Sequence, residues 1–570
     1  MESGINPNNS PMEFKKGSNA DDIYLKRNGM IYYSEPMGIP SYYKKLLETC
    51  PDLLQSQPSA SVAWLFMDYN CLIYHCLGSP TLRPFPVDAT LKEQQEWESE
   101  LIAEIVAYTL HIIMTVAPEN GVYLAIDGVV PMAKMRQQRL RRFKSAWLAK
   151  HGWSEKPTLW DTNAITPGTM FMKRLREGLE KMIRSKRKTA TWRLSSSDEP
   201  GEGEHKILRE WRQRDIQGTV AVYGMDADLI LLTMLCAEQT ASTAPKNILL
   251  FREAQSSTAD AVTEWEWFSI AVLRTLLCTL HGNLSSADAE RQWILTYCCA
   301  MSLLGNDFVP RSLSFTLRDE GNAELVSILR TLPPGPLFTE EGLLCAEQWA
   351  ALFQHLADRE PTALHTAIQK KRRQAQYVQE ETEMGQRNWP LTQLASDEQH
   401  LLTPYYPYDL RDDWQAVYIQ SFFHGWHSSD HRCIVEHYLD SLQWVWTYYW
   451  VGADAVCYNW YYPHSLPPTW TTIAAYGSNR LMKRWSRSLP IEVKSTDVQP
   501  TEQLALVLPH RSWSLIPSTD STTRLRAFPE RAPYFFPSEF TLDSVGKRFF
   551  WECEPCIPVP SITELKAIVG

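Results

Sequence analysis

The sequence predicts an α/β protein in which a mostly parallel central sheet is flanked by helices on both faces. Short segments of strand length alternate with amphipathic segments of helical length along the first half of the chain. Such alternation is typical of parallel sheets, because each strand is followed by a crossover that returns the chain to the same edge. Several of the expected strands end in an acidic residue, at the edge where open parallel sheets bind their ligands.

Five strands are expected from short runs bounded by polar or turn residues. They cover residues 61–67, 122–126, 191–194, 219–223 and 247–251. The helices expected between them include residues 91–116, 134–150 and 170–187. Two further helices should open at the turn-rich segments 198–206 and 224–229, where glycines interrupt the chain.

The composition is that of a soluble globular protein. The chain has 570 residues, 44% of them hydrophobic and 21% charged, which is enough for two or three domains. Its net charge is −10, so a nucleic-acid partner has to be argued from local basic patches rather than from the total. The 12 cysteines are scattered, several within apolar runs, which predicts reduced thiols in an intracellular protein. We expect no signal peptide and no membrane span, and we favour the cytoplasm over the nucleus.

Shifts in composition suggest four regions. Residues 1–36 are rich in Asn, Ser and Gly and are expected to form a loosely ordered extension. A folded domain should cover 37–320, followed by a helical or flexible connector at 321–404 that is rich in Gln, Glu, Arg and Lys. The last region, 405–570, is aromatic: 11 of the 22 tryptophans lie at or after Trp389, which predicts a second, mixed region packed against the first.

Seven acidic residues share one setting, close to an apolar strand or a glycine. They are Asp68, Asp127, Glu202, Glu204, Asp226, Asp228 and Asp307. Any one of them alone is more often a helix cap or an ion-pair partner, but seven at strand ends indicate a site. So many converging carboxylates repel one another unless divalent cations neutralise them, and ligation by oxygen alone favours Mg²⁺ or Mn²⁺. Two such ions, roughly 3.5–4 Å apart, are the arrangement that cleaves phosphodiesters.

A strongly basic helix follows the strand that ends at Asp127. Lys134, Gln138, Arg141 and Arg142 are spaced i, i+4, i+7 and i+8, so their side chains share one face. Seven basic residues and no acidic one lie between Lys134 and Lys150. This pattern suits a phosphate pocket beside a metal site. The alternative is a solvated basic helix that packs through Met135 and Phe143.

The motifs of the chain resemble those of the XRN family of 5′→3′ exoribonucleases, within the wider flap-endonuclease and PIN-like superfamily. In the first region they are Met37-Gly-Ile-Pro, Met67-Asp-Tyr-Asn, residues 125–139, Ile165-Thr-Pro-Gly-Thr, Pro200-Gly-Glu-Gly-Glu-His-Lys, Tyr223-Gly-Met-Asp-Ala-Asp-Leu and Leu304-Gly-Asn-Asp-Phe-Val-Pro. In the second they are residues 438–449, Trp460-Tyr-Tyr-Pro, residues 502–509 and residues 543–551. The resemblance extends from Met37 to about Leu565 and suggests a minimal or divergent member that consists of the catalytic core.

The resemblance implies an activity and a role for each residue set. The seven acids would be catalytic and would hold two Mg²⁺ ions, with Mn²⁺ as a substitute. Lys134, Gln138, Arg141 and Arg142 would bind the 5′-monophosphate of single-stranded RNA. The enzyme would degrade that RNA processively to mononucleotides in the 5′→3′ direction, and residues 405–570 would complete the active-site pocket.

Unpaired bases would stack on aromatic side chains, and here the chain departs from the family pattern. Where the family usually has a stacking histidine, this chain has Tyr74, followed by His75. In the second region the candidates are Tyr458 and Trp460, although Trp460 alone is as typical of a core tryptophan.

Two other functions compete with this interpretation. A structure-specific DNA flap nuclease would share the carboxylates but not the basic quartet or the aromatic second region. A catalytically inactive scaffold that binds RNA ends would be expected to have lost metal ligands, and all seven are present. The residues indicate no membrane partner and leave protein partners open.

Overall fold

The computed structural model describes most of the chain on both sides of several gaps. The described residues are 42–151, 160–186, 191–214, 216–224, 226–239, 247–254, 264–376, 391, 394–401, 410–423, 431–486 and 492–570. The extension expected at 1–36 and the motif that begins at Met37 lie outside these residues.

A seven-stranded sheet forms the centre of the protein, with the strand order β1-β7-β6-β5-β2-β3-β4. Its five parallel strands are β2 (Val62–Asp68), β3 (Gly121–Ala125), β4 (Thr191–Ser195), β5 (Thr219–Tyr223) and β6 (Asn247–Glu253). At one edge β7 (Trp265–Ser269) runs antiparallel to β6 and pairs with the short β1 (Leu54–Gln55). The predicted fold class, a mostly parallel sheet, is therefore confirmed. A separate hairpin-like pair joins β8 (Leu542–Asp543) to β9 (Glu554–Pro555).

The strands are apolar on both sides because both faces of the sheet are covered. In β2, Leu65 and Met67 point into one hydrophobic cluster, whereas Phe66 between them points into the other. This alternation follows from the pleat, in which successive side chains point to opposite faces. Every residue of β3 and β5 is buried, as is typical of strands in a parallel sheet between two helical layers.

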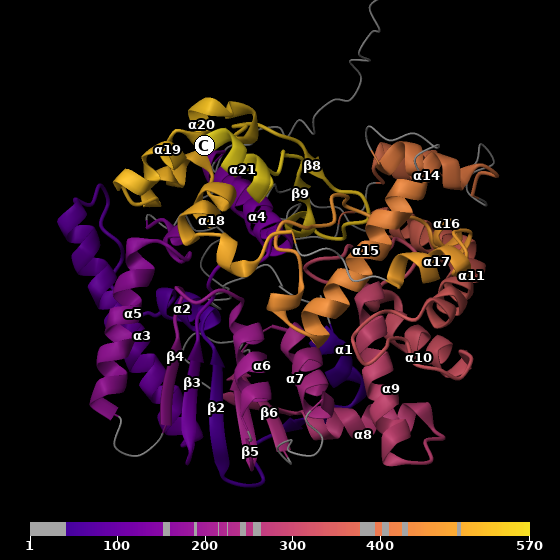
Figure 1. Ribbon diagram of the computed structural model, residues 1–570, viewed down its shortest axis with the longest axis horizontal. Helices are drawn as coiled ribbons and strands as arrows, with labels where there is room; N and C mark the ends of the chain where they lie inside the picture. Colours follow the sequence, from indigo (N-terminus) through magenta and orange to yellow (C-terminus); the bar gives the residue numbers. More distant parts are fainter. Residues whose placement is uncertain are drawn as a thin grey trace, which may run out of the picture.

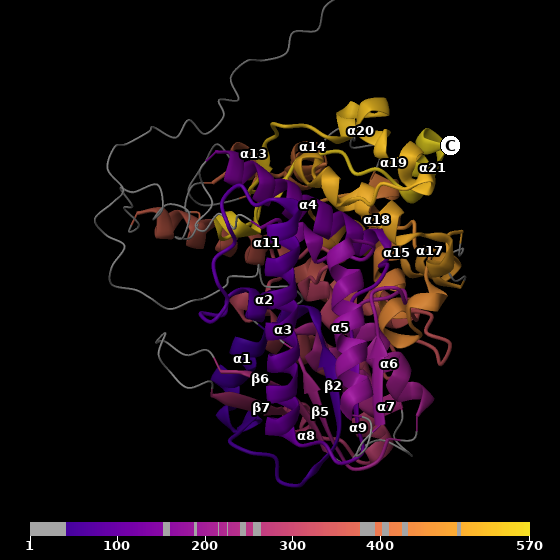
Figure 2. The same cartoon turned by 90° about the vertical axis from the view of Figure 1, so that its left-hand side faces the viewer.

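Helices form a layer on each face of the sheet (Figures 1 and 2). One cluster packs β-strand side chains against α2 (Asn70–Leu77), α3 (Leu91–Val116) and α5 (Met170–Lys186). The other packs them against α1 (Tyr42–Thr49), α6 (Gly203–Gln213), α7 (Asp228–Gln239), α8 (Ile270–His281) and α9 (Ala287–Ala300). The three expected helices at 91–116, 134–150 and 170–187 are present within two residues of their predicted bounds.

Helix α3 is the one described helix that is long and apolar enough to cross a membrane by length and composition, with a mean hydropathy of 1.4 over its most apolar window. Its packing is that of a helix on a sheet, because Trp97, Leu101 and Ile105 lie in the hydrophobic cluster. The buried Glu98 on the same helix pairs with Arg174 of α5.

The connections place a crevice at the carboxyl end of β2. From β2 the chain crosses through α2 and α3 to β3 on one side, and after β4 it returns through α6 to β5 on the other side. Crossovers that diverge onto opposite faces leave an opening above the strand between them, which is where open α/β sheets bind ligands. Asp68 is the last residue of β2 and therefore lies at this opening.

The rest of the described chain is mostly helical, and its C-terminal helices lie over this end of the sheet (Figure 1). Its helices are α10 (Gly321–Thr331), α11 (Ala346–Ala375), α13 (Ser396–His400), α14 (Trp414–Phe422), α15 (His431–Trp450), α16 (Trp470–Ala474), α17 (Ser478–Trp485), α18 (Pro500–Val507), α19 (Thr523–Arg526), α20 (Phe528–Arg531) and α21 (Ile562–Val569). The domain boundaries expected at 320 and 404 remain a prediction. One hydrophobic cluster runs across both, and α11 within the expected connector packs against α16 and α17.

Helix α4 (Met132–Lys150), the predicted basic helix, packs against α18 and β9 and is largely buried as far as Lys144. Arg139 is completely buried and donates to the carbonyl oxygens of Pro558 (3.2 Å), Leu506 (2.7 Å) and Phe535. Lys144 donates to the carbonyl oxygens of Trp551 (2.6 Å) and Cys553 (2.8 Å).

These contacts contradict the alternative of a solvated basic helix. The charged side chains of Lys134, Arg139, Arg142 and Lys144 are all buried, in addition to Met135 and Phe143. Burial lowers the pKa of Arg139 to about 9, which still leaves its guanidinium charged at neutral pH. The basic residues of α4 therefore serve partly to join two distant segments of the chain.

Replacing Arg139 by methionine should destabilise the protein strongly. The change would remove this donor from the buried carbonyl oxygens of Leu506 and Phe535, each at a cost of roughly 1–3 kcal/mol. We expect a lower denaturant midpoint in urea unfolding than for Arg184→Met, the matched control on α5, whose side chain is 63% exposed. Equal midpoints for the two variants would contradict the role of Arg139 as a structural anchor.

Candidate metal centre and phosphate pocket

The first part of the candidate site is built from residues at the carboxyl ends of the parallel strands. Asp68 ends β2, and Asp127 lies two residues beyond the end of β3. Glu202 is the N-cap residue of α6 and Glu204 lies in the first turn of that helix. These positions bring acids from separate strands to one edge, and the positive end of the α6 dipole favours negative charge there.

Two glycines allow the acids to come close together. A Cβ atom on Gly203 would lie 2.4 Å from Oδ1 of Asp68, so only glycine leaves room for that carboxylate. Gly201 has a φ of 109°, a backbone conformation that other residues rarely adopt. The backbone N–H of Gly203 also donates to Oδ1 of Asp127 (2.7 Å), while Asn70 donates to Oδ2 (2.8 Å).

The remaining acids follow β5 or come from a later segment of the chain. Asp228 is the first residue of α7, Asp226 lies in the turn between β5 and α7, and Asp307 follows the short helix Met301–Leu304. Electrostatic interactions connect Asp226 to Asp68, and Asp307 to both Asp226 and Asp228. The structure thus brings the seven predicted acids into one connected cluster.

The side chain of Lys134 lies inside this acidic cluster. Its Nζ is 2.6 Å from Oε2 of Glu202 and 2.7 Å from Oδ2 of Asp307. Burial opposes the charge of Lys134, but the carboxylates of Asp307 and Glu202 outweigh it and raise the pKa of the lysine well above its usual value. Lys134 therefore acts as an internal counter-cation for the acids, a contact that the spacing on the helix did not predict.

The pKa values show how strongly the carboxylates disfavour a shared negative charge. Burial and the neighbouring acids raise the pKa of Asp68, Glu204 and Asp228 well above the usual carboxyl range. Burial, with Asp307 as the next contribution, raises the pKa of Asp226 to about 7. A single lysine does not neutralise this cluster, so the site favours further cations.

Several oxygen atoms in the cluster are open to a metal ion. Oδ1 of Asp226 and Oδ1 of Asp228 are buried and have no hydrogen-bond partner in the structure. Glu202, Glu204 and His205 offer ligand atoms that all lie within 4.8 Å of one another. The donor set is dominated by carboxylate oxygen, which fits a hard divalent cation such as Mg²⁺ or Mn²⁺. The residues present therefore fit the metal centre that the sequence implies.

Helix α15 contributes two contacts that the sequence reasoning did not identify. The hydroxyl of Tyr448 donates to Oε1 of Glu202 (2.7 Å), and the hydroxyl of Tyr449 donates to Oδ2 of Asp228 (3.2 Å). His205 was also missed: its ring lies 3.7 Å from the ring of Tyr448, and its buried Nε2 has no hydrogen-bond partner. The motif around Glu202 and the double tyrosine were visible in the sequence, but neither indicates a contact between them.

The predicted phosphate quartet is divided between two surroundings. Lys134 lies among the acids, whereas Gln138 and Arg142 are buried further along the same face of α4. Oε1 of Gln138 and one terminal nitrogen of Arg142 have no hydrogen-bond partner, and burial lowers the pKa of Arg142 to about 10. A buried charged donor without a partner is costly, so this position suits an anionic ligand.

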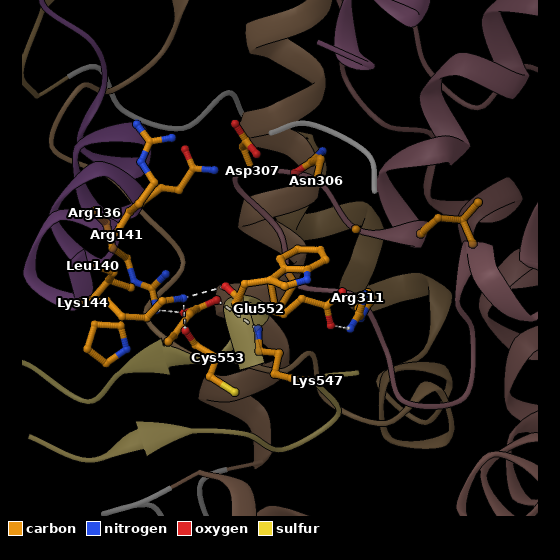
Figure 3. A pocket seen from close by; sticks show the side chains of 17 residues that line it. Arg136, Leu140, Arg141, Lys144, Asn306, Asp307, Arg311, Lys547, Glu552 and Cys553 are labelled. Carbon is orange, nitrogen blue, oxygen red and sulfur yellow. Dashed lines mark hydrogen bonds and ion pairs between the residues drawn. The ribbon is translucent and has the colours of Figure 1, made fainter. Parts of the chain in front are cut away.

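Arg141 lines a neighbouring pocket of about 200 Å³, which Figure 3 shows with Asp307 on the opposite side. Other cations of this pocket are already paired within the protein. Arg136 and Lys547 lie 3.4 and 3.1 Å from Glu554, and Arg311 lies 2.8 Å from Glu552. These neighbours hold the pKa of both glutamates near 2. The pocket borders the acidic cluster through Asp307, but its cations mainly neutralise its own acids.

The four residues expected to stack on bases differ in how far their rings are exposed to solvent. Tyr74 on α2 is half-buried and lies near enough to Arg142 to influence its pKa. The ring of His75 is turned toward α3, where it stacks on Tyr108 with 4.4 Å between centroids, and its Nδ1 lies 4.0 Å from Glu253.

In the second region only one of the two candidates retains an exposed surface. Tyr458 is completely buried, so its ring has no exposed face in this structure. Its backbone oxygen instead accepts a hydrogen bond from Met132 at the start of α4 (2.7 Å). Trp460 is partly buried and stacks on Trp444 with 5.5 Å between centroids. Tyr74 and Trp460 thus remain the candidates closest to what stacking requires.

A mostly parallel sheet with carboxylates gathered at the carboxyl ends of its strands has the architecture of a PIN-like nuclease domain. Residues 37–244 match the family model described as XRN 5′–3′ exonuclease N-terminus, and residues 412–567 match the model described as Xrn1 helical domain. Together these matches cover more than half of the sequence. The chain belongs to the XRN family of 5′–3′ exonucleases.

Curated relatives align with most or much of the chain. The 5′–3′ exoribonuclease 1 of Saccharomyces cerevisiae is 24% identical, over 90% of this chain and 42% of that protein. The protein of the same name from Homo sapiens is 26% identical, over 92% and 33%. The 5′–3′ exoribonuclease 2 of Eremothecium gossypii is 26% identical, over 63% and 45%. The chain spans less than half the length of each of these relatives.

Divalent cations should stabilise the protein more at high than at low pH. The pKa values of Asp226, Asp68 and Glu204 are raised in the folded state, so the stability of the metal-free protein falls as the pH rises from the ordinary carboxyl range through about 7. Cations that bind the folded state offset this loss. We expect Mg²⁺, compared with EDTA, to raise the melting temperature more at about pH 8 than at about pH 5.5.

The control for this measurement is Asp226→Asn, which removes one of the titrating carboxylates. The difference between the two pH values should be smaller in that variant. A Mg²⁺ shift of equal size at both pH values in the unmodified protein would contradict the prediction.

Proposed function

We propose that this chain is a Mg²⁺-dependent 5′→3′ exoribonuclease that degrades single-stranded RNA with a 5′-monophosphate to mononucleotides. The observation that carries the proposal is the contact between two functional surfaces. A cluster of seven buried or partly buried carboxylates adjoins the buried polar face of α4, and Lys134 belongs to both. The relatives described above bear the name exoribonuclease, which supports RNA as the substrate class.

In this proposal the seven acids hold two Mg²⁺ ions at the carboxyl edge of the sheet. When bound, the two ions supply the charge that activates water and stabilises the leaving oxygen. Oδ1 of Asp226 and Oδ1 of Asp228 are the ligand atoms that the protein leaves open for them. Asp127 is held differently, because Asn70 and the N–H of Gly203 already orient both of its oxygens.

The basic face of α4 would fix the end of the RNA. Arg142 holds a buried terminal nitrogen without a hydrogen-bond partner, and Gln138 and Arg141 lie beside it on the helix. Charge-assisted hydrogen bonds to a terminal phosphate would place the first phosphodiester at the acids. Water would then attack the phosphorus between the first and second nucleotides, and the 3′-oxygen of the first would leave.

The products explain why this reaction would repeat along one strand. The first nucleotide is released as a nucleoside 5′-monophosphate, and the phosphate that was attacked remains on the second nucleotide. The shortened RNA therefore again carries the 5′-monophosphate that the basic face binds. Half-buried Tyr74 and Trp460 are the proposed surfaces on which the following bases stack during each step.

The second region completes the site in this proposal. Residues 37–320 would form the nuclease domain and 405–570 the region that closes the pocket. The contacts of Tyr448 and Tyr449 with the acids, and those of Arg139 with the C-terminal segment, support this division of roles. A flap nuclease would not need the buried polar face of α4. A scaffold that binds RNA ends without cleaving them would not need seven acids.

Hydrolysis should be lost in the variant that carries both Asp226→Asn and Asp228→Asn. Removing two ligand charges displaces the cations, and loss of the activated nucleophile should reduce the rate by several orders of magnitude. The assay follows labelled RNA with monophosphate, triphosphate or hydroxyl 5′ ends, with and without Mg²⁺. The control variant is Asp397→Asn, on helix α13 and outside the acidic cluster, which should keep full activity. Full activity in the double variant would disprove the proposed metal centre.

Replacing both Arg141 and Arg142 by alanine should remove most of the preference for 5′-monophosphate over 5′-hydroxyl RNA. Each charge-assisted hydrogen bond contributes roughly 1.5–3 kcal/mol, so the loss of two guanidinium groups corresponds to about a hundredfold or more. Arg136→Ala is the matched control on the same helix, because Arg136 pairs with Glu554. Circular RNA offers no end, so cleavage of a circle by the unmodified protein as fast as linear 5′-monophosphate RNA would refute end recognition.

A further inference from the structure

Two adjacent tyrosines on α15 reach two different carboxylates of the metal centre. Tyr448 donates to Glu202 at 2.7 Å and Tyr449 donates to Asp228 at 3.2 Å. Both tyrosines are buried, and the residues that they contact lie 246 and 221 positions away in the sequence. Helix α15 lies beside α7 and the Met301–Leu304 helix, which places its last turns next to the acids (Figure 1).

Each tyrosine occupies one oxygen of its carboxylate and leaves the other for a cation. Oδ2 of Asp228 accepts from Tyr449, whereas its buried Oδ1 has no partner. Oε1 of Glu202 accepts from Tyr448, whereas its Oε2 lies 2.6 Å from the ammonium group of Lys134. In both acids the tyrosine hydroxyl fixes the rotation of the carboxylate. The second oxygen of Glu202 then faces the ammonium group of Lys134, and the second oxygen of Asp228 has no partner.

The surroundings hold the two hydroxyls in place. The ring of Tyr448 stacks on Trp444 at 5.1 Å and lies 3.7 Å from His205. Gln443 anchors the helix by accepting from the N–H of Leu344 and donating to the oxygen of Gly342. Because these contacts involve the rings and the backbone, removing a hydroxyl should leave the helix where it is.

We propose that Tyr448 and Tyr449 are positioning residues that orient Glu202 and Asp228 for divalent cations, so that the metal centre depends on the docking of α15. The inference rests on the proposed metal centre, because it assigns the residues that support its ligands. Hydrogen bonds to ligating carboxylates are part of what sets metal affinity, and their loss typically costs roughly 10- to 100-fold. The tyrosines touch neither substrate nor ion and act through the two acids.

The test measures Mn²⁺ binding to the full chain without RNA, from the free-ion signal in electron paramagnetic resonance. Tyr448→Phe and Tyr449→Phe should each weaken binding by roughly 10- to 100-fold while the circular dichroism spectrum is unchanged. Tyr438→Phe is the matched control, since Tyr438 lies on the same helix, is completely buried and has a hydroxyl without a hydrogen-bond partner. That variant should bind Mn²⁺ like the unmodified protein.

A double-mutant cycle separates positioning from a purely structural effect. If Tyr448 acts through Glu202, then Tyr448→Phe should change Mn²⁺ affinity much less in a Glu202→Gln background than in the unmodified protein. RNA cleavage by Tyr448→Phe should also recover as Mg²⁺ is raised, which a collapsed fold would not allow.

The inference is overturned if both phenylalanine variants bind Mn²⁺ like the unmodified protein, or if Tyr438→Phe weakens binding equally. An unmodified protein that binds Mn²⁺ but does not cleave RNA would refute the proposed function and leave the inference standing. An unmodified protein that binds no Mn²⁺ would refute both.

Discussion

Repulsion among buried carboxylates is the constraint on which the organisation of this protein depends. Burial, together with repulsion from neighbouring acids, raises the pKa of Asp68 at the end of β2 and of Asp228 at the start of α7. Such a cluster is stable only if positive charge and hydrogen-bond donors surround it. Lys134 from α4 supplies positive charge, and two tyrosines from α15 supply hydrogen-bond donors.

Helix α4 connects this constraint to the rest of the molecule. One of its faces presents Lys134 to the acids, and another carries Arg139, whose guanidinium binds three carbonyl oxygens of the C-terminal segment. A rigid helix held at both faces keeps the intervening Gln138 and Arg142 in a fixed position. Buried polar groups that are fully partnered specify one arrangement, so the unpartnered atoms of these two residues stand out as the places for a ligand.

The sequence allowed the sheet and the acids to be predicted because both follow from local patterns. Apolar runs that end in an acid identify strands, and the parallel arrangement then brings Asp68 and Asp127 to the same edge. Contacts between distant segments leave no such pattern. The helical spacing of α4 grouped Lys134 with the predicted phosphate-binding residues, whereas its long side chain reaches Glu202. The sequence around Tyr458 likewise does not indicate whether its ring is buried or exposed.

The two regions matched by family models are therefore joined by chemistry as well as by packing. Six of the seven acids lie in the first region and Asp307 lies between the two, but the hydroxyls of Tyr448 and Tyr449 come from the second, and a single hydrophobic cluster runs through both. Without the second region, Glu202 and Asp228 would each lose a hydrogen-bond donor, and the acids beside them would be exposed to water. Water would screen the repulsion but also weaken the field that binds cations. Both regions therefore contribute groups that balance the charge of the acidic cluster.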